Sequence, residues 1–345
     1  MNVNTISTSS INAQIAKGTF RPHTALSNMG LNFFLNSQDY FARSIFPICR
    51  VRRSADNYHR FGLEDLLRSG WAAKPALGKV MPTVFGEDTD TYAVKVYQMI
   101  MGIDEIDETD ISRREGPSYA NDTRQINTKI IAEHANILQD EMFANSFFRA
   151  GVWNNEVTGV DGTTPNADET IKWTNDNSDP VQYVSELKLD MKRKTGREPN
   201  RMALGAEVFT ALRKHPAILE RVKYGGSTPN PAKVTKNVLA QLFEMDDLSV
   251  MMSIHNQAKV GKDADMKFIA DPTAMLLAYA TSTPSIKEPS AGYIFQWDML
   301  GDGQIMPIFH YPGEGGTHSE YVEGLMAFQM KKTADDLAVF VKDLV

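Results

Sequence analysis

The longest periodic segment of the chain is a helical pattern from Tyr119 to Phe148. Asn121 or Asp122 can cap its N-terminus, and Gly151 follows its end. At 1.5 Å per residue such a helix is about 45 Å long, which exceeds the width of an ordinary domain, so neighbouring elements or other chains are expected to cover part of it. Its apolar side comprises Ile126, Ile130, Ile131, Ile137, Leu138, Met142 and Phe148, with Gln125, Lys129, Glu133, Asn136 and Asp140 opposite.

Two β-rich runs, Lys79 to Phe85 and Thr91 to Met101, flank the turn residues 86–88. Apolar side chains occur on both faces of the second run, and the pair of runs predicts a β-hairpin. An isolated two-stranded ribbon is at best marginally stable in water, so this one needs a surface to lie on. We expect it to contact a neighbouring subunit through Val84, Phe85, Tyr92, Val94 and Val96.

Charged side chains cluster on either side of this hairpin. An acidic run occupies 104–110 and lacks the alternating oxygen ligands and central glycine of a calcium-binding EF-hand loop, which favours a solvated or interface-pairing cluster. The densest basic cluster is Arg50, Arg52 and Arg53, which could contact phosphate or an acidic strip on a neighbour. The candidate contact residues from both clusters are Arg52, Arg53, Asp104, Glu105 and Asp107.

A glycine-rich segment at 225–228 has the composition of a phosphate cradle. However, Pro229 and Pro231 remove two of the amide donors that such a cradle needs. A loop that shapes a subunit contact fits this segment better. Its candidate contact residues are Tyr224, Gly225 and Gly226.

Helical and strand patterns alternate between about 199 and 285 and predict a separate α/β unit. Helices are expected at 180–194, at 207–222 with an interruption at Pro216, and at 233–244. Strands are expected at 201–204, 248–254, 266–269 and 274–280, and the last two are apolar enough to be central in a sheet. Later strands are expected at 305–311, 321–331 and 338–341.

The first fifty residues mix polar stretches with short apolar clusters that lack a sustained period. They predict either an arm that buries its apolar groups against something other than itself, or a short helix from Leu26 to Phe46 on its own domain. The first basic residue is Lys17, so we expect no secretory signal peptide. The longest strongly apolar stretch, near 274–280, is far short of the ~20 residues that span a bilayer.

Composition narrows the class of protein further. A chain of 345 residues favours two domains, and 42% hydrophobic with 23% charged residues excludes wholesale disorder. The single cysteine, Cys49, excludes an internal disulfide and any CxxC site. A net charge of -7 disfavours a protein that reads duplex nucleic acid, because an acidic chain repels phosphate.

Common catalytic signatures are missing from the sequence, including HExxH, GxSxG and the Walker loop. We therefore expect no catalytic residue, no cofactor and no metal site. The nearest metal constellation is His310, His318 and Glu320, whose spacing matches no zinc pattern and favours surface polar residues. A metal-dependent hydrolase built on these three remains the competing hypothesis, and His134 is expected to pack within the apolar side of the long helix.

The order of arm, hairpin, long helix, α/β unit and returning strands resembles the major capsid proteins of tailed bacteriophages, which have the Hong Kong 97-like capsid fold. Encapsulins share that fold. The residues that carry the resemblance are Pro199 to Leu212, His215, Pro216 and Tyr224, then Val238 to Phe243 with Leu248 to Val250, then Pro289 to Tyr293 with Trp297, and finally Glu323 leading to Lys332, Thr333 and Ala334.

The resemblance implies an α+β fold with an N-terminal arm, an extended β-hairpin loop, a long spine helix, a peripheral domain and an axial domain. By it, the arm is 1–50, the extended loop 51–104, the peripheral domain 105–198 with the spine helix at 119–148, and the axial domain 199–300. The C-terminal strands, 301–345, would return to the peripheral domain.

The implied function is structural: a major capsid protein that assembles as hexamers and pentamers into an icosahedral shell around double-stranded DNA. Its implied partners are further copies of the chain, a separate scaffolding protein, a portal protein and possibly a decoration protein, with no membrane. The chain would be assembled in the host cytoplasm and reside in the virion. An encapsulin-like compartment shell is the near alternative.

Overall fold

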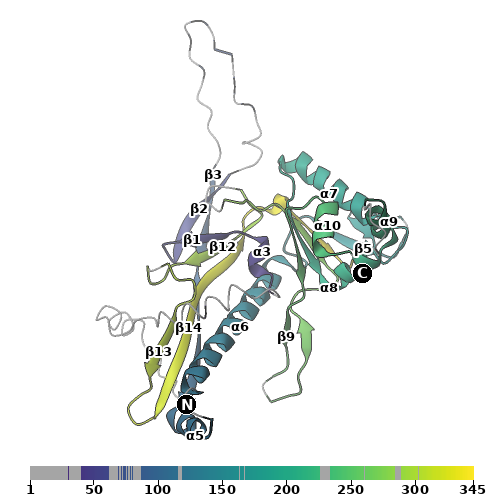
Figure 1. Ribbon diagram of the computed structural model, residues 1–345. Helices are drawn as coiled ribbons and strands as arrows, with labels where there is room; N and C mark the ends of the chain where they lie inside the picture. Colours follow the sequence, from purple (N-terminus) through teal and green to yellow (C-terminus); the bar gives the residue numbers. More distant parts are fainter. Residues whose placement is uncertain are drawn as a thin grey trace. The chain divides into compact units, whose positions relative to one another are not determined.

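The computed structural model describes residues 30, 40–61, 69, 71, 73–74, 76, 78, 80, 87–115, 119–162, 164–166, 168–225, 234–259, 261–283, 289–301 and 303–345. The chain divides into two compact units (Figure 1). Unit 1 contains Met1–Ser37, Val94–Leu138 and Trp297–Phe328, and unit 2 contains Gln38–Ala93, Gln139–Gln296 and Gln329–Val345.

Unit 1 combines helices with an antiparallel sheet. Its elements are α5 (Glu105–Glu115), the first part of α6 (Tyr119–Phe147), β4 (Lys95–Asp104), β13 (Ile308–Pro312) and the first part of β14 (Ser319–Lys332). β14 pairs with β4 over Ser319–Phe328 and with β13 over Glu320–Gly324. A Cβ atom at Gly324 would overlap Ile131 of α6, so only glycine lets the helix lie this close to the strand.

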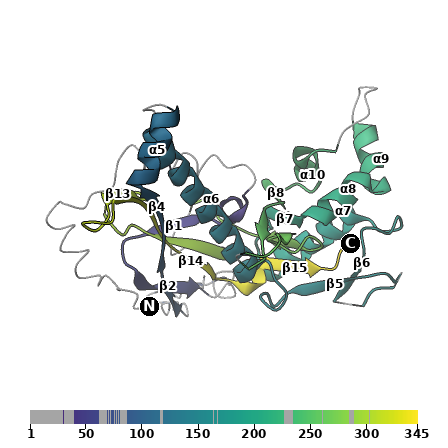
Figure 2. The same cartoon turned by 90° about the horizontal axis from the view of Figure 1, so that it is seen from below.

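Unit 2 contains a six-stranded mixed sheet of order β6-β5-β15-β11-β7-β8. The strands are β5 (Glu156–Val160), β6 (Glu169–Ile171), β7 (Arg201–Gly205), β8 (Asp247–Met251), β11 (Met275–Ala278) and β15 (Ala338–Lys342). Its helices are α7 (Pro180–Thr195), α8 (Ala206–Lys214), α9 (Pro216–Gly225) and α10 (Lys236–Leu242) (Figure 2). Their apolar side chains form one core with those of the strands, around Trp173, Leu204, Leu212 and Leu277.

The ends of α7 follow from its sequence. The Asp179 carboxylate accepts hydrogen bonds from the backbone N–H groups of Val181 and Gln182, both at 3.1 Å, and Pro180 starts the helix. Gly196 closes it in the left-handed conformation, with φ of 69°. The predicted break at Pro216 is also present, since α8 ends before it and α9 begins there.

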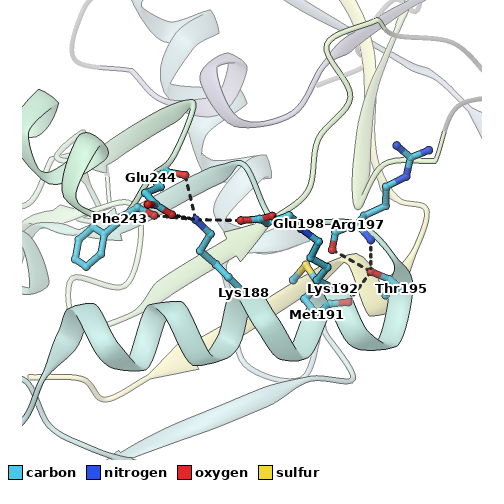
Figure 3. Close-up of polar contacts among 8 residues, drawn as sticks. All are labelled: Lys188, Met191, Lys192, Thr195, Arg197, Glu198, Phe243 and Glu244. Atoms are coloured by element: carbon cyan, nitrogen blue, oxygen red, sulfur yellow. Dashed lines mark hydrogen bonds and ion pairs between the residues drawn. The ribbon is translucent and has the colours of Figure 1, made fainter.

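The buried ammonium of Lys188 closes the C-terminal end of α10 (Figure 3). Lys188 lies on α7 and is only 6% exposed. Its Nζ donates to the carbonyl oxygens of Phe243 and Glu244, both at 3.2 Å, and lies 3.2 Å from Glu244 Oε2 and 3.3 Å from Glu198 Oε1. The last carbonyls of a helix lack partners within it and carry its negative dipole end, so this cation stabilises the junction.

We expect Lys188→Met to lower the free energy of unfolding by about 2 kcal/mol, because the buried carbonyl of Phe243 and the partly buried carbonyl of Glu244 lose their donor while the apolar stem is kept. The matched control is Lys192→Met on the same helix. Lys192 is 58% exposed at its side chain and binds the same Glu198 at 2.9 Å, so its loss should cost under about 1 kcal/mol. Urea unfolding of both variants tests this, and equal effects would contradict the role given to Lys188.

Unit 2 also contains elements outside the six-stranded sheet and its four helices. They are α3 (Ala42–Ile45), β1 (Ile48–Val51), β2 (Ala55–Phe61), β3 (Glu87–Ala93), β9 (Ile254–Asn256), β10 (Met266–Phe268), η1 (Asp335–Leu337) and β12 (Gly292–Trp297), whose last residue falls in unit 1. The rings of Phe41 and Phe46 contact Phe143 and Phe147, with centroids 5.6 and 4.6 Å apart. This part of the predicted arm therefore buries its apolar groups within its own chain, and residues 1–29 and 31–39 lie outside the described part.

The predicted hairpin has different strands from those expected. β3 pairs with β2, from Ala55 opposite Ala93 to Phe61 opposite Glu87, and residues 79 and 81–85 of the expected partner lie outside the described residues. The run 91–101 is also divided, since β3 ends at Ala93 and β4 begins at Lys95. The rings of Tyr58 and Tyr92 both pack on Phe295, with centroids 5.6 and 4.7 Å away, which holds β2 beside β3.

The long helix is confirmed, but its buried side differs from the predicted one. Ile126 is half exposed, whereas Asn136 and Asp140, expected on the outer side, are buried. His134, expected to be packed, is exposed. Polar groups lie inside because partners from distant parts of the chain satisfy them: the Asp140 carboxylate accepts hydrogen bonds from the backbone of Phe41 and Ala42.

One strand of unit 2 lies elsewhere than expected. β10 was predicted to be central but is exposed and pairs only with β9 among the described strands, whereas β11 is fully buried between β15 and β7. β15 was expected to return to the peripheral domain, 105–198, and it lies between β5 of that segment and β11. Residues Ala338 to Val341 are all buried, and a strand that is apolar on both faces needs such a central place.

Candidate functional site

The predicted contact residues divide into those that their own chain covers and those that are exposed. Tyr92 belongs to the first group: its ring stacks on Phe295 at an interplanar angle of 11°, and burial raises the pKa of its hydroxyl. Its side chain is therefore not presented to another subunit, and that prediction is wrong. Val84 and Phe85 lie outside the described residues.

Strand β4 presents the clearest exposed apolar surface among the predicted residues. Val96 is 49% and Ile100 47% exposed, and Val94, between β3 and β4, is half-buried. Among the described strands β4 pairs with β14 alone, so its other edge carries unpaired backbone groups. Ile100 was missed by sequence reasoning, although its spacing of four residues from Val96 places both on one face of the strand.

Two of the acidic candidates have roles within their own chain. Asp104 accepts hydrogen bonds from the N–H groups of Ile106 at 2.8 Å and Asp107 at 3.4 Å, and so caps α5. Glu105 Oε2 lies 3.7 Å from His318 Nδ1. Asp107 is exposed and remains a candidate contact residue.

The basic candidates lie in the turn between β1 and β2. Arg52 and Arg53 are both exposed, and Arg53 Nη1 lies 3.5 Å from Asp56 Oδ2. An exposed pair of this kind contributes little to stability, so the guanidinium can exchange partners at low cost. In the glycine-rich segment, Gly225 ends α9, while the Tyr224 side chain and Gly226 lie outside the described part.

The candidate metal ligands are not brought together as a site. His310 Nε2 lies 2.9 Å from Glu320 Oε2, and Arg124 binds both side chains, while His318 is directed to Glu105 instead. Burial opposes ionisation of Glu320, but hydrogen bonds from Arg124 and His310 outweigh it and hold its pKa below the ordinary value. A guanidinium thus occupies the position that a cation would need, which argues against the hydrolase hypothesis.

A mainly apolar cavity lies in unit 1. It has a volume of about 260 Å³ and is lined by residues of α6, β4 and β14, together with Met306. His134 and Tyr97 are the titratable groups of its described lining. Without a carboxylate or lysine beside them, they offer neither an acid–base pair nor a set of metal ligands.

Sequence reasoning missed a second apolar surface, on the hairpin of β9 and β10. Ile254 is 51% and Met266 62% exposed, and Met252 and Phe268 are also exposed. The alternation of Met252 with Ile254 was the available signal, but the apolar run 266–269 was interpreted as a buried strand.

In the described part of the chain no helix is long and apolar enough to cross a membrane.

No protein-family model matches this sequence. A curated relative, the major capsid protein of Burkholderia phage BcepMu, is 24% identical over 237 residues, which cover 68% of this chain and 70% of the relative. A crystal structure of a phage-related protein from Bordetella bronchiseptica RB50 aligns over 94% of this chain and 98% of its own, with a TM-score of 0.69 and 19% identity. The chain has the Hong Kong 97-like capsid fold.

The mature capsid of bacteriophage PhiM1 shows the same fold in an assembled particle. Its subunit covers 89% of this chain and 87% of its own, with a TM-score of 0.52 and 12% identity. This structure shows the shared fold alone. The curated relative, which is named a major capsid protein, confirms the predicted resemblance to phage major capsid proteins and the structural role as a capsid protein. In this capsid fold, the exposed apolar surfaces on β4 and on the β9–β10 hairpin are the candidate functional sites.

Proposed function

We propose that this capsid protein assembles as hexamers and pentamers into an icosahedral shell that encloses phage double-stranded DNA. The observation that carries the proposal is the exposed apolar face of β4, with Val96 and Ile100 on a strand whose second edge is unpaired among the described strands. Soluble proteins protect such edges, and one left apolar is suited to pairing with another chain.

Several contacts per subunit make a closed shell stable even when each one is weak. Arg52, Arg53, Val94 and Asp107 are proposed as further contact residues because each is at least partly exposed. Val84, Phe85, Tyr224, Gly225 and Gly226 remain proposed contacts from the sequence alone.

The net charge of -7 suits a shell wall that faces packed DNA, because a wall rich in lysine would hold the DNA and resist ejection. The family resemblance further supports a separate scaffolding protein, a portal protein and a possible decoration protein as partners, with assembly in the host cytoplasm. The contents of purified particles distinguish this function from an encapsulin-like compartment, since DNA supports a virion and a packaged enzyme supports a compartment.

We expect Val96→Asp to abolish particle formation while leaving the subunit folded. A carboxylate at a half-exposed position destabilises the free subunit little. Burying that charge in an apolar contact between subunits, without a partner, costs several kcal/mol, on the order of the desolvation penalty of an unpaired charge. Val96→Thr, which keeps the β-branched shape, is the matched control and should reduce particle yield far less.

The measurement is electron microscopy and sedimentation of the chain expressed with its scaffolding protein. Shells from wild type and Val96→Thr but not from Val96→Asp would support the proposal. Unfolding of the Val96→Asp monomer would show that Val96 lies in the core of its own chain, and monomers or small closed dimers of wild type would contradict the function itself.

A further inference from the structure

The β9–β10 hairpin has two chemically different faces. In its antiparallel register Ile254 is opposite Phe268 and Asn256 is opposite Met266, so these four side chains share one face. His255 and Lys267 are opposite each other on the other face. The hairpin therefore concentrates its apolar groups on a single side.

The other face of the hairpin is fixed to α6. His255 Nδ1 lies 2.6 Å from Glu141 Oε1 on that helix, and Gln257 Nε2 lies 3.0 Å from His255 Nε2. Ser253, which precedes β9 and alternates in phase with His255, is buried. Because this anchored face points toward α6, the face with Ile254, Met266 and Phe268 points away from it and is exposed.

The exposed charges near the tip of this hairpin are mainly positive. Lys259 and Lys262 are both exposed, and two exposed acidic residues, Asp263 and Asp265, lie between them and the next strand. Asp265 and Lys267 neutralise each other, since Lys267 Nζ lies 2.9 Å from Asp265 Oδ2. An apolar face beside two lysines is suited to a partner that presents an apolar side chain beside carboxylates.

Helix α5 has that complementary chemistry. Ile106 is 66% exposed, an unusual position for an isoleucine, and Asp107 and Asp110 beside it are exposed. The neighbouring Glu105 and Glu108 are engaged within the chain by His318 and Arg124. Among the described side chains of α5, Arg113 is exposed and basic, and it lies about one turn beyond Asp110.

We propose that α5 of one copy docks on the apolar face of the β9–β10 hairpin of a neighbouring copy. Ile106 contacts Ile254, Met266 and Phe268, and Asp107 and Asp110 pair with Lys259 and Lys262. This inference rests on the proposed shell assembly and names one contact within it. The contact is heterologous, since each copy offers a different surface to each of its two neighbours, and such contacts form a ring when the rotation between copies closes.

Charge reversal tests the contact directly. We expect Lys259→Glu with Lys262→Glu, and separately Asp107→Lys with Asp110→Lys, to lower particle yield about tenfold, because like charges then face each other. The chain carrying all four substitutions should recover particle yield, and all variants should keep the thermal stability of wild type. Particles are counted by sedimentation and electron microscopy after expression with the scaffolding protein.

Co-expression of the two double variants separates a contact between copies from one within a chain. Alternating copies of the two variants present opposite charges at every contact of a hexamer, so co-expression should restore hexamers. Rescue by the fourfold variant without rescue by co-expression would overturn the proposal, as would normal yield of both double variants from a chain whose wild type forms shells. If wild type itself forms no particles, the proposed function fails together with this inference.

Discussion

Gly205→Ala is expected to lower the free energy of unfolding by about 4 kcal/mol, the largest effect of any single methyl group considered for this chain. Gly205 ends β7 with φ of -64° and ψ of 156°, an ordinary backbone conformation, so strain is not the reason. The reason is space: a Cβ atom there would overlap the backbone carbonyl of Pro272.

That carbonyl cannot move away without loss of hydrogen bonds. Pro272 O accepts from the N–H groups of Glu207 at 3.1 Å and Val208 at 3.3 Å, and Gly205 N–H donates to Ala274 O at 2.9 Å. These bonds join the end of β7, the start of α8 and the approach to β11. Any shift that accommodates a methyl group therefore disrupts the junction of β7, α8 and the segment that precedes β11.

The matched control for Gly205→Ala is Gly162→Ala. A Cβ atom at Gly162 has no neighbour within 4 Å, so this substitution should change stability by less than about 0.5 kcal/mol. Urea unfolding followed by the fluorescence of the tryptophans, including Trp173 in this core, measures both. A loss below about 1 kcal/mol for Gly205→Ala would show that the sheet can relax around the added methyl group.

Asp140→Ala is expected to lower the free energy of unfolding by about 3 kcal/mol, because this buried carboxylate joins the last part of the predicted arm to the long helix. Asp140 Oδ1 accepts from the N–H of Ala42 at 2.9 Å and of Phe41 at 3.2 Å, and so satisfies the first donors of α3, which has no side-chain cap of its own. Alanine leaves both donors buried without an acceptor.

Asp140→Asn is the matched variant, since its amide oxygen can accept the same two bonds and it carries no charge. We expect it to be at least as stable as wild type at pH 7 by urea unfolding. Equal losses for the alanine and asparagine variants would show that the charge, and not the hydrogen bonds to α3, is what the fold requires.

The same residue makes stability depend on pH. Burial raises the pKa of the Asp140 carboxyl to about 6, opposed only in part by neighbouring donors and by the charge of Arg43. The folded chain therefore holds a proton that the unfolded chain, with an ordinary pKa near ~4, has released. The resulting stabilisation is fully present below about pH 4 and is lost as the pH rises through about 6.

The comparison with Asp140→Asn isolates this contribution from those of other carboxylates. The pKa of Asp179 is held below its ordinary value chiefly by its hydrogen bonds from Arg221. A carboxyl group of this kind stabilises the fold less as the pH falls, which is opposite to the effect of Asp140. Between pH 7 and pH 4, wild type should therefore gain stability relative to Asp140→Asn. A constant difference between the two proteins over this range would mean that Asp140 does not titrate there.

Helices whose ends are set by residues close in sequence could be predicted from caps and prolines. The ends of α7 follow from Asp179 and Gly196, and the break between α8 and α9 follows from Pro216, because caps and prolines act within a few positions. The long helix and the α/β alternation were also predicted, and with their order they indicated the capsid fold.

The errors concern contacts between distant residues. The buried face of α6 could not be found from its apolar arc, because Asp140 is satisfied by Phe41 and Ala42, about a hundred positions earlier. The partner of β3 depends on the packing of Tyr58 and Tyr92 against Phe295, far along the chain. For the same reason, an apolar segment such as Met266–Phe268 cannot be assigned to a core or to an interface by its composition.

The exposed apolar surfaces of this subunit are expected to be covered by other copies of the same chain. Electron cryo-microscopy of the purified assembly shows whether they are. We predict closed icosahedral particles with sixfold and fivefold capsomers, in which Val96 and Ile100 lie buried at contacts between copies. A stable monomer at assembly concentrations, or a closed shell in which β4 stays exposed to solvent, would contradict the claim.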